Sequence, residues 1–575
     1  GVNGGSIVLS GDTDLVYVSS VDGTGSADNP VTDQSLNFYQ AVIVDQDLYV
    51  QSDGSMVIKN LTAPGTGPGQ TGTGNLIVTN TAEDKGSIEL QNNLFHEGTG
   101  VDTSFAGDIS GLNGAAANTD LVKTGANKLT LSGNVTLAGD IIAEEGTLQL
   151  NGTADVEALH LNSADADSPA VIGVGGRATA RTLAGGDNGG KLDIASSGTL
   201  TLTGATDGLS HTEIAGTGTL AIAEGASLGL AADSTLSGVV LDLDGSLSLE
   251  ADGSAGGLNG SGSLELNGQT LQIQAASGQT HTYEGTLGEG TLDVSGAGTQ
   301  VLRSSGADTG LTISGGNLVL QGKADVDGAR LSYGNLVNSG NLTIQASDNS
   351  LTAVNTTLSV ENASFSSGSA TTFTLNTDAD MTASFIEASG DVVIEDGASF
   401  HVTSIPDVNI TWKSGNPMEL TLMELTGDGT IDLGENTLTV GGLFLTYYKN
   451  AHLVQEGDKV VLKAEEQTDN VYAGVADTAN SMAGANLLWD AARHGSIDQA
   501  VTDFLGALNN DMLNNPSAAR RSLAAAAGST VNALGTAQKD ALRDQMGWIR
   551  NRTTLMGVNP AYVNDDLPRF HMWME

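Results

Sequence analysis

The sequence predicts an all-β chain, a right-handed parallel β-helix (a solenoid) that is followed by a C-terminal α-helical segment. Three observations predict this fold. Short alternating segments led by glycine recur along the chain, they lie mostly 17 to 28 residues apart, and the composition changes near residue 470. A repeat of that length is too small to bury its own apolar face, so successive units must stack on one another. The handedness follows from the rule for crossovers between parallel strands.

The repeating unit is a five-residue segment in which apolar and polar residues alternate after a glycine, as in GTLQL at 146–150. A period of two is typical of a strand with one buried face, so the leucines are expected to point inward. Consecutive segments between Gly198 and Gly340 start 20, 27, 17, 28, 26 and 24 residues apart. The segments begin at Gly74, Gly86, Gly146, Gly198, Gly218, Gly245, Gly262, Gly290, Gly316, Gly340, Gly390 and Gly429.

The corners between these strands contain Gly, Asn and Asp, which supply the positive φ angles that a sharp corner needs. Pro169 and Pro406 are the only prolines between residues 72 and 412, so few backbone N–H donors are lost from the strand ladders. At about 24 residues per rung, residues 1–470 would form roughly 20 rungs and a rod on the order of 95 Å long. A β-sandwich built from hairpins is the alternative, which the irregular strand spacing and the lack of regular two-residue turns disfavour.

Charge and composition exclude several classes of partner and chemistry. The net charge is −46, from 68 acidic and 22 basic residues, which argues against binding to nucleic acid and to anionic membrane surfaces. There is no cysteine, so disulfides, thiolate metal sites and thiol catalysis are excluded. The N-terminal sequence has no basic start followed by an apolar core, and no run approaches the ~20 apolar residues of a membrane helix.

The tail differs from the repeats. Residues 1–470 have a net charge of −44 and residues 471–575 a net charge of −2, with three of the four tryptophans in the second segment. The pattern predicts helices at 481–495, at 496–515 and within 516–557. The last residues, RFHMWME, alternate like the opening of a strand, so we expect the natural chain to continue into a further β-domain. The predicted domains are therefore a β-helical rod at 1–470, a helical linker or cap at 471–557, and the start of a β-barrel at 558–575.

Two stretches resemble a known family. LVKTGANKLTLSGNVTLAGDIIAEEGTLQLNG at 121–152 resembles the passenger-associated repeat of autotransporters, the type V secreted proteins of Gram-negative bacteria. ALRDQMGWIRNRTT followed by LPRFHMWME resembles the junction where a passenger's linker helix enters its translocating barrel. The resemblance implies a cleaved signal peptide, export across the periplasm, an outer-membrane β-barrel as partner, and a location at the cell surface or in the medium. The residues that match the repeat are Leu121, Lys123, Gly125, Leu129, Leu131, Gly133, Gly146, Leu148 and Leu150.

A search for catalytic motifs gives little. GASLG at 225–229 has the form of a nucleophile elbow, but more repeat follows it instead of a helix, so a corner between rungs is the simpler interpretation. GPGQTG at 67–72 has the form of a phosphate loop, but no helix follows it either. The histidines are scattered and form no metal motif, with His160 and His401 on predicted strands. No cofactor, metal site or catalytic residue is therefore assigned.

Acidic pairs are the remaining candidates. Asp242 and Asp244 share one face of a predicted strand, and Glu144 with Glu145 flanks a corner. Such pairs serve glycosidases or lyases and also bind Ca²⁺, although a solvated acidic face is the commoner explanation. Asp187, in LAGGDNGGKLD, comes nearest to a Ca²⁺-binding repeat without matching it.

The arginine-rich tail helix allows two interpretations. It could thread the polar lumen of a barrel or cap the end of the β-helix, and both remain open. Its arginines are Arg520, Arg521, Arg543, Arg550 and Arg552.

Two functions follow from different classes. The first is a surface-displayed or secreted rod that binds host or bacterial glycans or proteins, an adhesin. The second is a β-helix enzyme that cleaves polysaccharide or mucin-type glycans. Aromatic residues make up only 4% of the chain, which disfavours an enzyme that needs sugar-binding platforms. Residues 30–60 and 90–110 interrupt the repeat and are where a side loop could hold a site.

Overall fold

The computed structural model divides the chain into two compact units. The first comprises residues 1–402, 419–439 and 452–462, and the second comprises residues 403–418, 440–451 and 463–575. The structure describes residues 102–323, 329–345, 355–375, 385–404, 418–440 and 448–494, together with shorter segments at 16–18, 31–32, 42–44, 48–51, 55–59, 61–62, 74–80, 85–91, 504–505, 507–509, 511–512 and 515–523.

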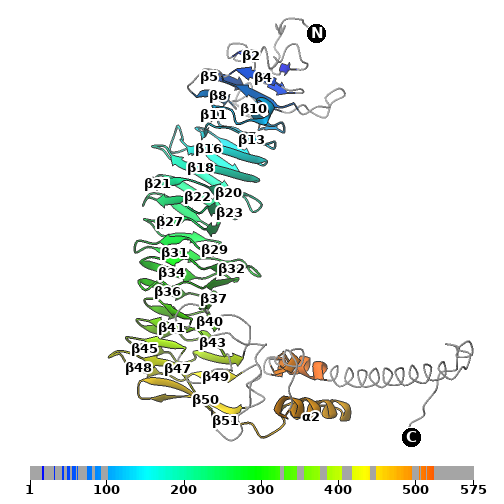
Figure 1. Cartoon of the computed structure of the whole chain (residues 1–575), viewed down its shortest axis with the longest axis vertical. Coiled ribbons are helices and arrows are strands. Elements are labelled where there is room, and N and C mark those ends of the chain that lie inside the picture. The colour runs from blue at the N-terminus through cyan, green and yellow to red at the C-terminus, as the bar shows by residue number, and fades with distance from the viewer. Residues whose placement is uncertain are drawn as a thin grey trace, which may run out of the picture. The chain divides into compact units, whose positions relative to one another are not determined.

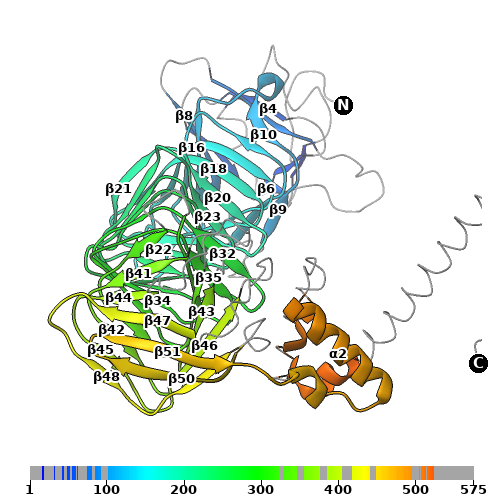
Figure 2. The same ribbon diagram turned by 60° about the horizontal axis from the view of Figure 1, so that its bottom comes forward.

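The first unit is a coil of parallel strands. Strand β15 (Thr147–Leu150), for example, pairs in parallel with β12 (Lys128–Leu131) on one side and with β17 (Val171–Val174) on the other. Its neighbours in space are therefore about twenty residues away in sequence, as in a solenoid. Successive strands follow one another along the unit (Figure 1), and a tilted view shows the rungs lying over one another (Figure 2). The parallel β-helix is confirmed and the hairpin sandwich is wrong, whereas the handedness of the coil stays a prediction.

The largest sheet has 15 strands and begins near the N-terminus. Its main path is β2 (Val31–Thr32), β4 (Leu48–Gln51), β7 (Leu76–Thr79), β10 (Ile109–Gly111), β13 (Val135–Thr136), β16 (Thr153–Leu161), β18 (Arg177–Gly185), β20 (Thr199–Leu202), β23 (Thr219–Ile222), β26 (Val240–Leu243) and β29 (Gly257–Asn259). Beside this path lie β5 (Ser55–Lys59), β8 (Gly86–Gln91), β11 (Thr119–Thr124) and β14 (Ile141–Ala143).

Three smaller sheets cover the other sides of the N-terminal half. They are β1 (Val16–Val18), β3 (Val42–Val44) and β6 (Leu61–Thr62); then β9 (Thr103–Phe105), β12, β15, β17, β19 (Gly190–Ile194), β22 (Thr212–Gly216) and β25 (Thr235–Ser237); then β21 (Ala205–Leu209), β24 (Ser227–Leu230), β27 (Ser246–Leu249), β30 (Ser263–Glu265) and β33 (Thr286–Leu287).

Three further sheets continue the coil toward residue 466. The first contains β28 (Gly253–Ala255), β31 (Thr270–Ile273), β34 (Gly290–Val294), β36 (Thr309–Ile313), β39 (Leu336–Asn338), β42 (Ala363–Phe365), β45 (Val392–Ile394) and β48 (Ile431–Leu433). The second contains β32 (Thr280–Tyr283), β35 (Thr299–Leu302), β37 (Asn317–Gln321), β40 (Asn341–Gln345), β43 (Ala370–Leu375), β46 (Ser399–Ser404) and β49 (Thr437–Val440). The third contains β38 (Arg330–Ser332), β41 (Thr357–Val360), β44 (Ile386–Ala388), β47 (Met418–Leu425), β51 (Lys459–Glu466) and β50 (Tyr448–Glu456).

The core of the coil consists of aliphatic columns that run from rung to rung. Each of the predicted glycine-led segments coincides with a strand, and the alternation places its apolar residues inside. Leu148 and Leu150 of β15 are 0% and 2% exposed, and they lie beside Leu129 and Leu131 of β12. Full burial of a leucine side chain contributes roughly 1.5–3 kcal/mol, so each rung is stabilised chiefly by its contact with the next.

One corner of the coil is a column of glycines. A Cβ on Gly107 would lie 1.9 Å from the carbonyl oxygen of Gly74, and a Cβ on Gly133 would lie 2.2 Å from that of Gly107. The column continues through Gly152 and Gly176, where the corresponding distances are 2.0 and 2.1 Å. Adjacent backbones approach so closely at this corner that any side chain would separate the rungs.

The second unit contains the described helices. Helix α2 (Ala479–His494) confirms the helix predicted at 481–495, and a 3₁₀ turn, η3 (Val471–Gly474), precedes it. Residues 504–505, 507–509, 511–512 and 516–523 are also helical, whereas the predicted segment 524–557 and the predicted strand at 558–575 lie outside the described residues. None of the described helices combines the length and apolarity that a membrane span requires.

Candidate interaction surface

The outer face of the 15-stranded sheet carries a row of side chains in register, one from each of ten strands of its main path. We call it the first outer row. Its members alternate with buried neighbours along their own strands, so they point away from the core. Across the sheet they succeed one another at the spacing of parallel strands, about 4.8 Å. The row is Tyr49, Ile77, Ser110, Thr136, Asp155, Thr179, Thr201, Ala221, Asp242 and Asn259.

A second outer row runs beside the first, at the residues where these strands begin. Polar side chains link its first members, because the backbone N–H of Asp108 donates to Asn75 Oδ1 at 2.9 Å and that of Asn134 donates to Asp108 Oδ1 at 2.7 Å. These bonds satisfy backbone donors at the corner where the strand ladder starts. The second outer row is Asn75, Asp108, Asn134, Thr153, Arg177, Thr199, Thr219 and Val240.

Two adjoining hollows open over the N-terminal end of both rows. One has a volume of about 380 Å³ and the other about 310 Å³, and they share Asp108, Ser110 and Gly114 as lining residues. The 3₁₀ turn η2 (Leu112–Gly114) follows β10 and lines the smaller hollow, and its last residue, Gly114, lines both. Asn113 and Gly114 have φ angles of +60° and +75°, which let the chain reverse sharply within two residues.

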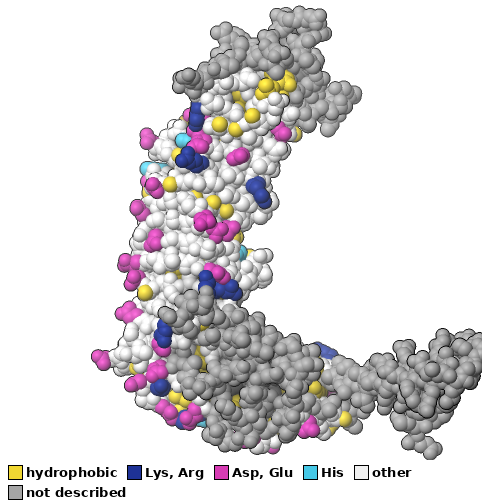
Figure 3. All heavy atoms as spheres, in the orientation of Figure 1, with side chains coloured by type: hydrophobic (Ala, Val, Ile, Leu, Met, Phe, Trp, Pro, Cys, Tyr) yellow, Lys and Arg dark blue, Asp and Glu magenta, His cyan; other side chains and the backbone are white. Residues whose placement is uncertain are grey.

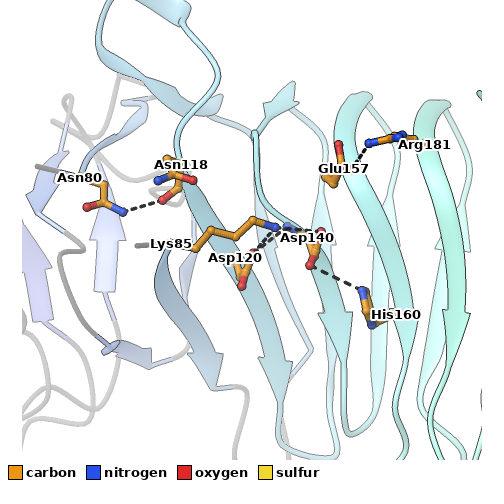
Figure 4. A network of polar contacts seen from close by, with 8 residues as sticks. All are labelled: Asn80, Lys85, Asn118, Asp120, Asp140, Glu157, His160 and Arg181. Carbon is orange, nitrogen blue, oxygen red and sulfur yellow. Dashed lines mark hydrogen bonds and ion pairs between the residues drawn. The ribbon is translucent and has the colours of Figure 1, made fainter. Parts of the chain in front are cut away.

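A charged ladder lies on the same sheet, over β11, β14, β16 and β18 (Figure 4). Lys85 Nζ lies 3.7 Å from Asp120 Oδ1 and 3.4 Å from Asp140 Oδ1. His160 Nε2 lies 3.5 Å from the other oxygen of Asp140. The chain of contacts therefore joins four successive rungs from the outside.

The ladder brings two carboxyl groups and one histidine together. The eight residues in Figure 4 offer no hydroxyl group to act as a nucleophile beside His160. The remaining ion pair, between Arg181 Nη1 and Glu157 Oε1 at 3.0 Å, joins half-exposed to exposed side chains, and such pairs contribute at most about 1 kcal/mol. We therefore interpret the ladder as a stabilising surface network. His160 lies on a strand, as predicted, and so does His401 on β46.

The predicted pair Asp242 and Asp244 does share the outer face of one strand, β26, and its end. Asp242 belongs to the first outer row, and Asp244 Oδ1 accepts hydrogen bonds from the backbone N–H and the hydroxyl of Ser261, both at 3.3 Å. Partial burial of its carboxyl group raises the pKa of Asp242, and the negative charge of Asp244 adds to the rise. A carboxyl group whose pKa is raised beside a second carboxyl group can serve as the acid of an acid–base pair.

The pair Glu144 and Glu145 is structural. It lies at the corner between β14 and β15, where Glu145 Oε2 accepts a hydrogen bond from the backbone N–H of Gly125 at 3.0 Å. Beneath this corner Lys123 is 0% exposed, and its ammonium donates to the carbonyl oxygens of Thr124, Gly125 and Glu145 at 2.8, 2.6 and 3.1 Å. The lysine of the repeat motif therefore closes the corner from inside, a role that the sequence search did not assign.

The other predicted motifs are corners. Gly225 of GASLG has a φ of +80°, and Ser227 begins strand β24, so this segment is a turn into a strand rather than a nucleophile elbow. Asp187 lies in the exposed turn between β18 and β19. The segment GPGQTG lies outside the described residues. Within the described part of the chain, no group of three or more His, Asp or Glu side chains is placed to hold a metal ion.

A buried polar cluster around Gln300 was not predicted from the sequence. Gln300 is 0% exposed, and its amide pairs with the backbone of Leu258, accepting from the N–H at 3.1 Å and donating to the carbonyl at 2.8 Å. His281 is 8% exposed beside it and contacts Asn259 through Nδ1 at 3.2 Å. The cluster lies where the 15-stranded sheet ends at β29, so side chains replace the missing ladder bonds.

Comparisons with known proteins give one match. No protein-family model matches the chain. No curated protein matches it either. Among solved structures, the crystal structure of the Haemophilus influenzae Hap adhesin is similar, with 12% sequence identity and a TM-score of 0.33. The similarity covers 74% of this chain and 56% of the Hap chain, so the chain spans little more than half the length of that protein.

Proposed function

We propose that this chain is the passenger of an autotransporter and acts at the cell surface as an adhesive rod. The observation that carries the proposal is the pair of outer rows, which present mainly polar side chains on successive strands of one sheet. Contacts that are weak singly become strong when one rod makes several of them to a surface with repeated epitopes. The partners would be glycans or proteins on host or bacterial surfaces.

Export to the surface is supported by the sequence. Residues 121–152 resemble the passenger-associated repeat, and the absence of cysteine suits passage through a narrow pore in an extended state. A coil that gains its stability rung by rung can also fold progressively after it emerges. The proposed partner in export is an outer-membrane β-barrel, and the proposed location is the outer surface or the medium of a Gram-negative bacterium.

The surface charge limits what the rod can bind. Asp and Glu side chains are scattered over the visible face of the first unit, and Lys and Arg are few (Figure 3). The net charge of −46 repels polyanions and other copies of the chain. We therefore expect neutral or cationic surfaces to be preferred, with retention that increases when added salt screens the repulsion from anionic ones.

A second candidate, a glycan-cleaving enzyme, has one observation in its favour: the raised pKa of Asp242 beside Asp244. Such an enzyme would use Asp242 as the acid and Asp244 as the base or nucleophile. Asp242→Asn would abolish cleavage but change only one of the ten side chains of the first outer row, so retention through the rest of the row separates the two functions.

The test is retention of the purified chain on immobilised mucins, host-cell surfaces and bacterial polysaccharides. We expect the chain to be retained on at least one of them, with Asp242→Asn retained equally. Absence of retention on every surface, or release of shortened glycan by the chain but not by Asp242→Asn, would contradict the adhesive function.

A further inference from the structure

We propose that the double hollow beneath η2 is a binding site for an uncharged oligosaccharide, an inference that rests on the adhesive function and names the ligand class. The site lies over β10, β13 and β16, between the first and second outer rows. Its two parts, about 380 and 310 Å³, each fall within the size range of small-ligand sites.

The charge of the lining excludes acidic ligands. Among the described residues that line the two hollows, the charged ones are Asp108 and Asp155, and none is Lys, Arg or His. A sulfated or sialylated glycan would bring a negative charge beside these carboxylates without a cation to balance it. An anionic ligand is therefore disfavoured by the same groups that would accept hydrogen bonds from a neutral one.

The polar groups of the lining can form hydrogen bonds with the hydroxyl groups of a ligand. The hollow of about 380 Å³ is lined by the hydroxyls of Ser110, Thr136 and Thr153, by the Asn134 amide and by two carboxylates. Hydroxyls and amides both donate and accept, and carboxylates accept, so the set can pair with ligand hydroxyls in either direction. Their spacing across parallel strands, about 4.8 Å, is close to the length of one pyranose unit.

An apolar strip adjoins the polar groups. Tyr49 and Ile77 belong to the first outer row, and Leu112 of η2 is 40% exposed. Hydrophobic side chains gather at this end of the first unit (Figure 3). A pyranose ring has a C–H face that packs against such side chains, with hydroxyls around its edge for the polar groups. A sugar satisfies both halves of the site.

A cationic peptide is the competing ligand, because it would also pair with carboxylates. The geometry favours the saccharide, because Asp108 Oδ1 already accepts the backbone N–H of Asn134 at 2.7 Å. Most of the lining groups are neutral, and a cationic peptide would leave the hydroxyl and amide groups hydrogen-bonded only to water. The peptide is kept as an outcome of the test.

The experiment uses the whole chain on an array of neutral, sialylated and sulfated oligosaccharides, with a lysine-rich peptide spotted beside them. The variants are Thr136→Ala and Asp155→Asn within the site, and Thr130→Ala as the control, because Thr130 faces outward on β12 in a different sheet and belongs to neither outer row. We expect binding to neutral glycans, weakened roughly tenfold by each site variant, since one hydrogen bond is worth about 1.4 kcal/mol, and unchanged by Thr130→Ala.

Several outcomes would overturn the site and not the function. These are binding to sialylated, sulfated or peptide ligands in preference to neutral glycans, or equal losses in all three variants. Retention on cell surfaces without binding to any arrayed neutral glycan would also overturn the site and leave adhesion standing. Loss of both retention and array binding would overturn the site and the proposed function together.

Discussion

Replacing Lys123 by methionine tests how a rung of the coil is closed. The substitution keeps the length and apolar bulk of the side chain, but it removes the ammonium that bonds to three carbonyl oxygens at 2.6–3.1 Å. The ammonium and the Gly125 carbonyl are buried, whereas Thr124 is partly exposed and Glu145 is exposed, so water replaces the lost donor to Gly125 most poorly. We expect the corner between β14 and β15, and the strands on either side, to open more readily.

The size of the effect follows from two opposing terms. Hydrogen bonds from a charged donor contribute about 2 kcal/mol each, so three contribute about 6 kcal/mol. Burial lowers the pKa of Lys123 from 10.5 to about 8, with the Glu145 carboxylate opposing the shift. At about 1.4 kcal/mol per unit, burial of the charge costs about 3 kcal/mol. The net loss on substitution is therefore about 2–3 kcal/mol, which corresponds to roughly 30- to 150-fold faster local opening.

Amide hydrogen exchange followed by mass spectrometry measures this opening in peptides covering residues 119–150. Lys191→Met is the matched control, because Lys191 forms its ion pair with Glu213 on the outer face at 2.7 Å and should cost no more than about 0.5 kcal/mol. Unchanged exchange in Lys123→Met, or an equal change in Lys191→Met, would refute the proposal that Lys123 holds the corner between β14 and β15 closed. The pKa of Lys123 is lower in the folded chain than in the unfolded chain, so the stability of the wild type should also rise between pH 8 and 10.5. Lys123→Met should lack this rise.

Three further predictions concern titration, the glycine corners and surface charge. Burial lowers the pKa of His281 below 6.5, so its contribution to stability is complete above pH 6.5 and is lost as the pH falls below it. Thermal melts from pH 7 to 5 should show this loss in the wild type and in the outward-facing His160→Gln, but not in His281→Gln. Gly146→Ala places a Cβ 2.5 Å from a backbone oxygen at a φ of +64° and should cost more than about 2 kcal/mol. Gly225→Ala, at +80° in open space, should cost about 1 kcal/mol, and equal urea midpoints for the two would contradict the close approach. Arg181→Gln, which breaks the exposed pair with Glu157, should shift the melting temperature by less than the error of the method, so a large shift would contradict the minor role of the ladder.

The sequence predicts the coil because each rung repeats the same physical requirement. Alternation in GTLQL places Leu148 and Leu150 inside, and stacking of like segments follows from the small size of the repeat. The same alternation also indicates which polar side chains point into the core. Lys123, His281 and Gln300 each occupy an inward position two residues from an inward Leu or Tyr, which marks them as buried polar groups that need internal partners.

The hollows could not be predicted from the sequence. Their lining combines Asp108, Asn134 and Thr153, which become neighbours only once the register between β10, β13 and β16 is known. These residues are 26 and 19 positions apart, and the repeat length varies too widely to give that register. Residues 90–110 were predicted to interrupt the repeat, yet the described part contains the end of β8, then β9 and β10, and the irregular turn η2 follows at Leu112.

The most direct test of the proposed function follows the ligand as well as the chain. The chain is incubated at saturation with the surface glycan that retains it best, and the bound fraction and the molar mass of the glycan are measured in the same sample over several hours. An adhesive rod predicts stable retention and a glycan of unchanged mass. Progressive loss of retention with shortening of the glycan, abolished by Asp242→Asn, would contradict adhesion and assign the chain to the enzymes.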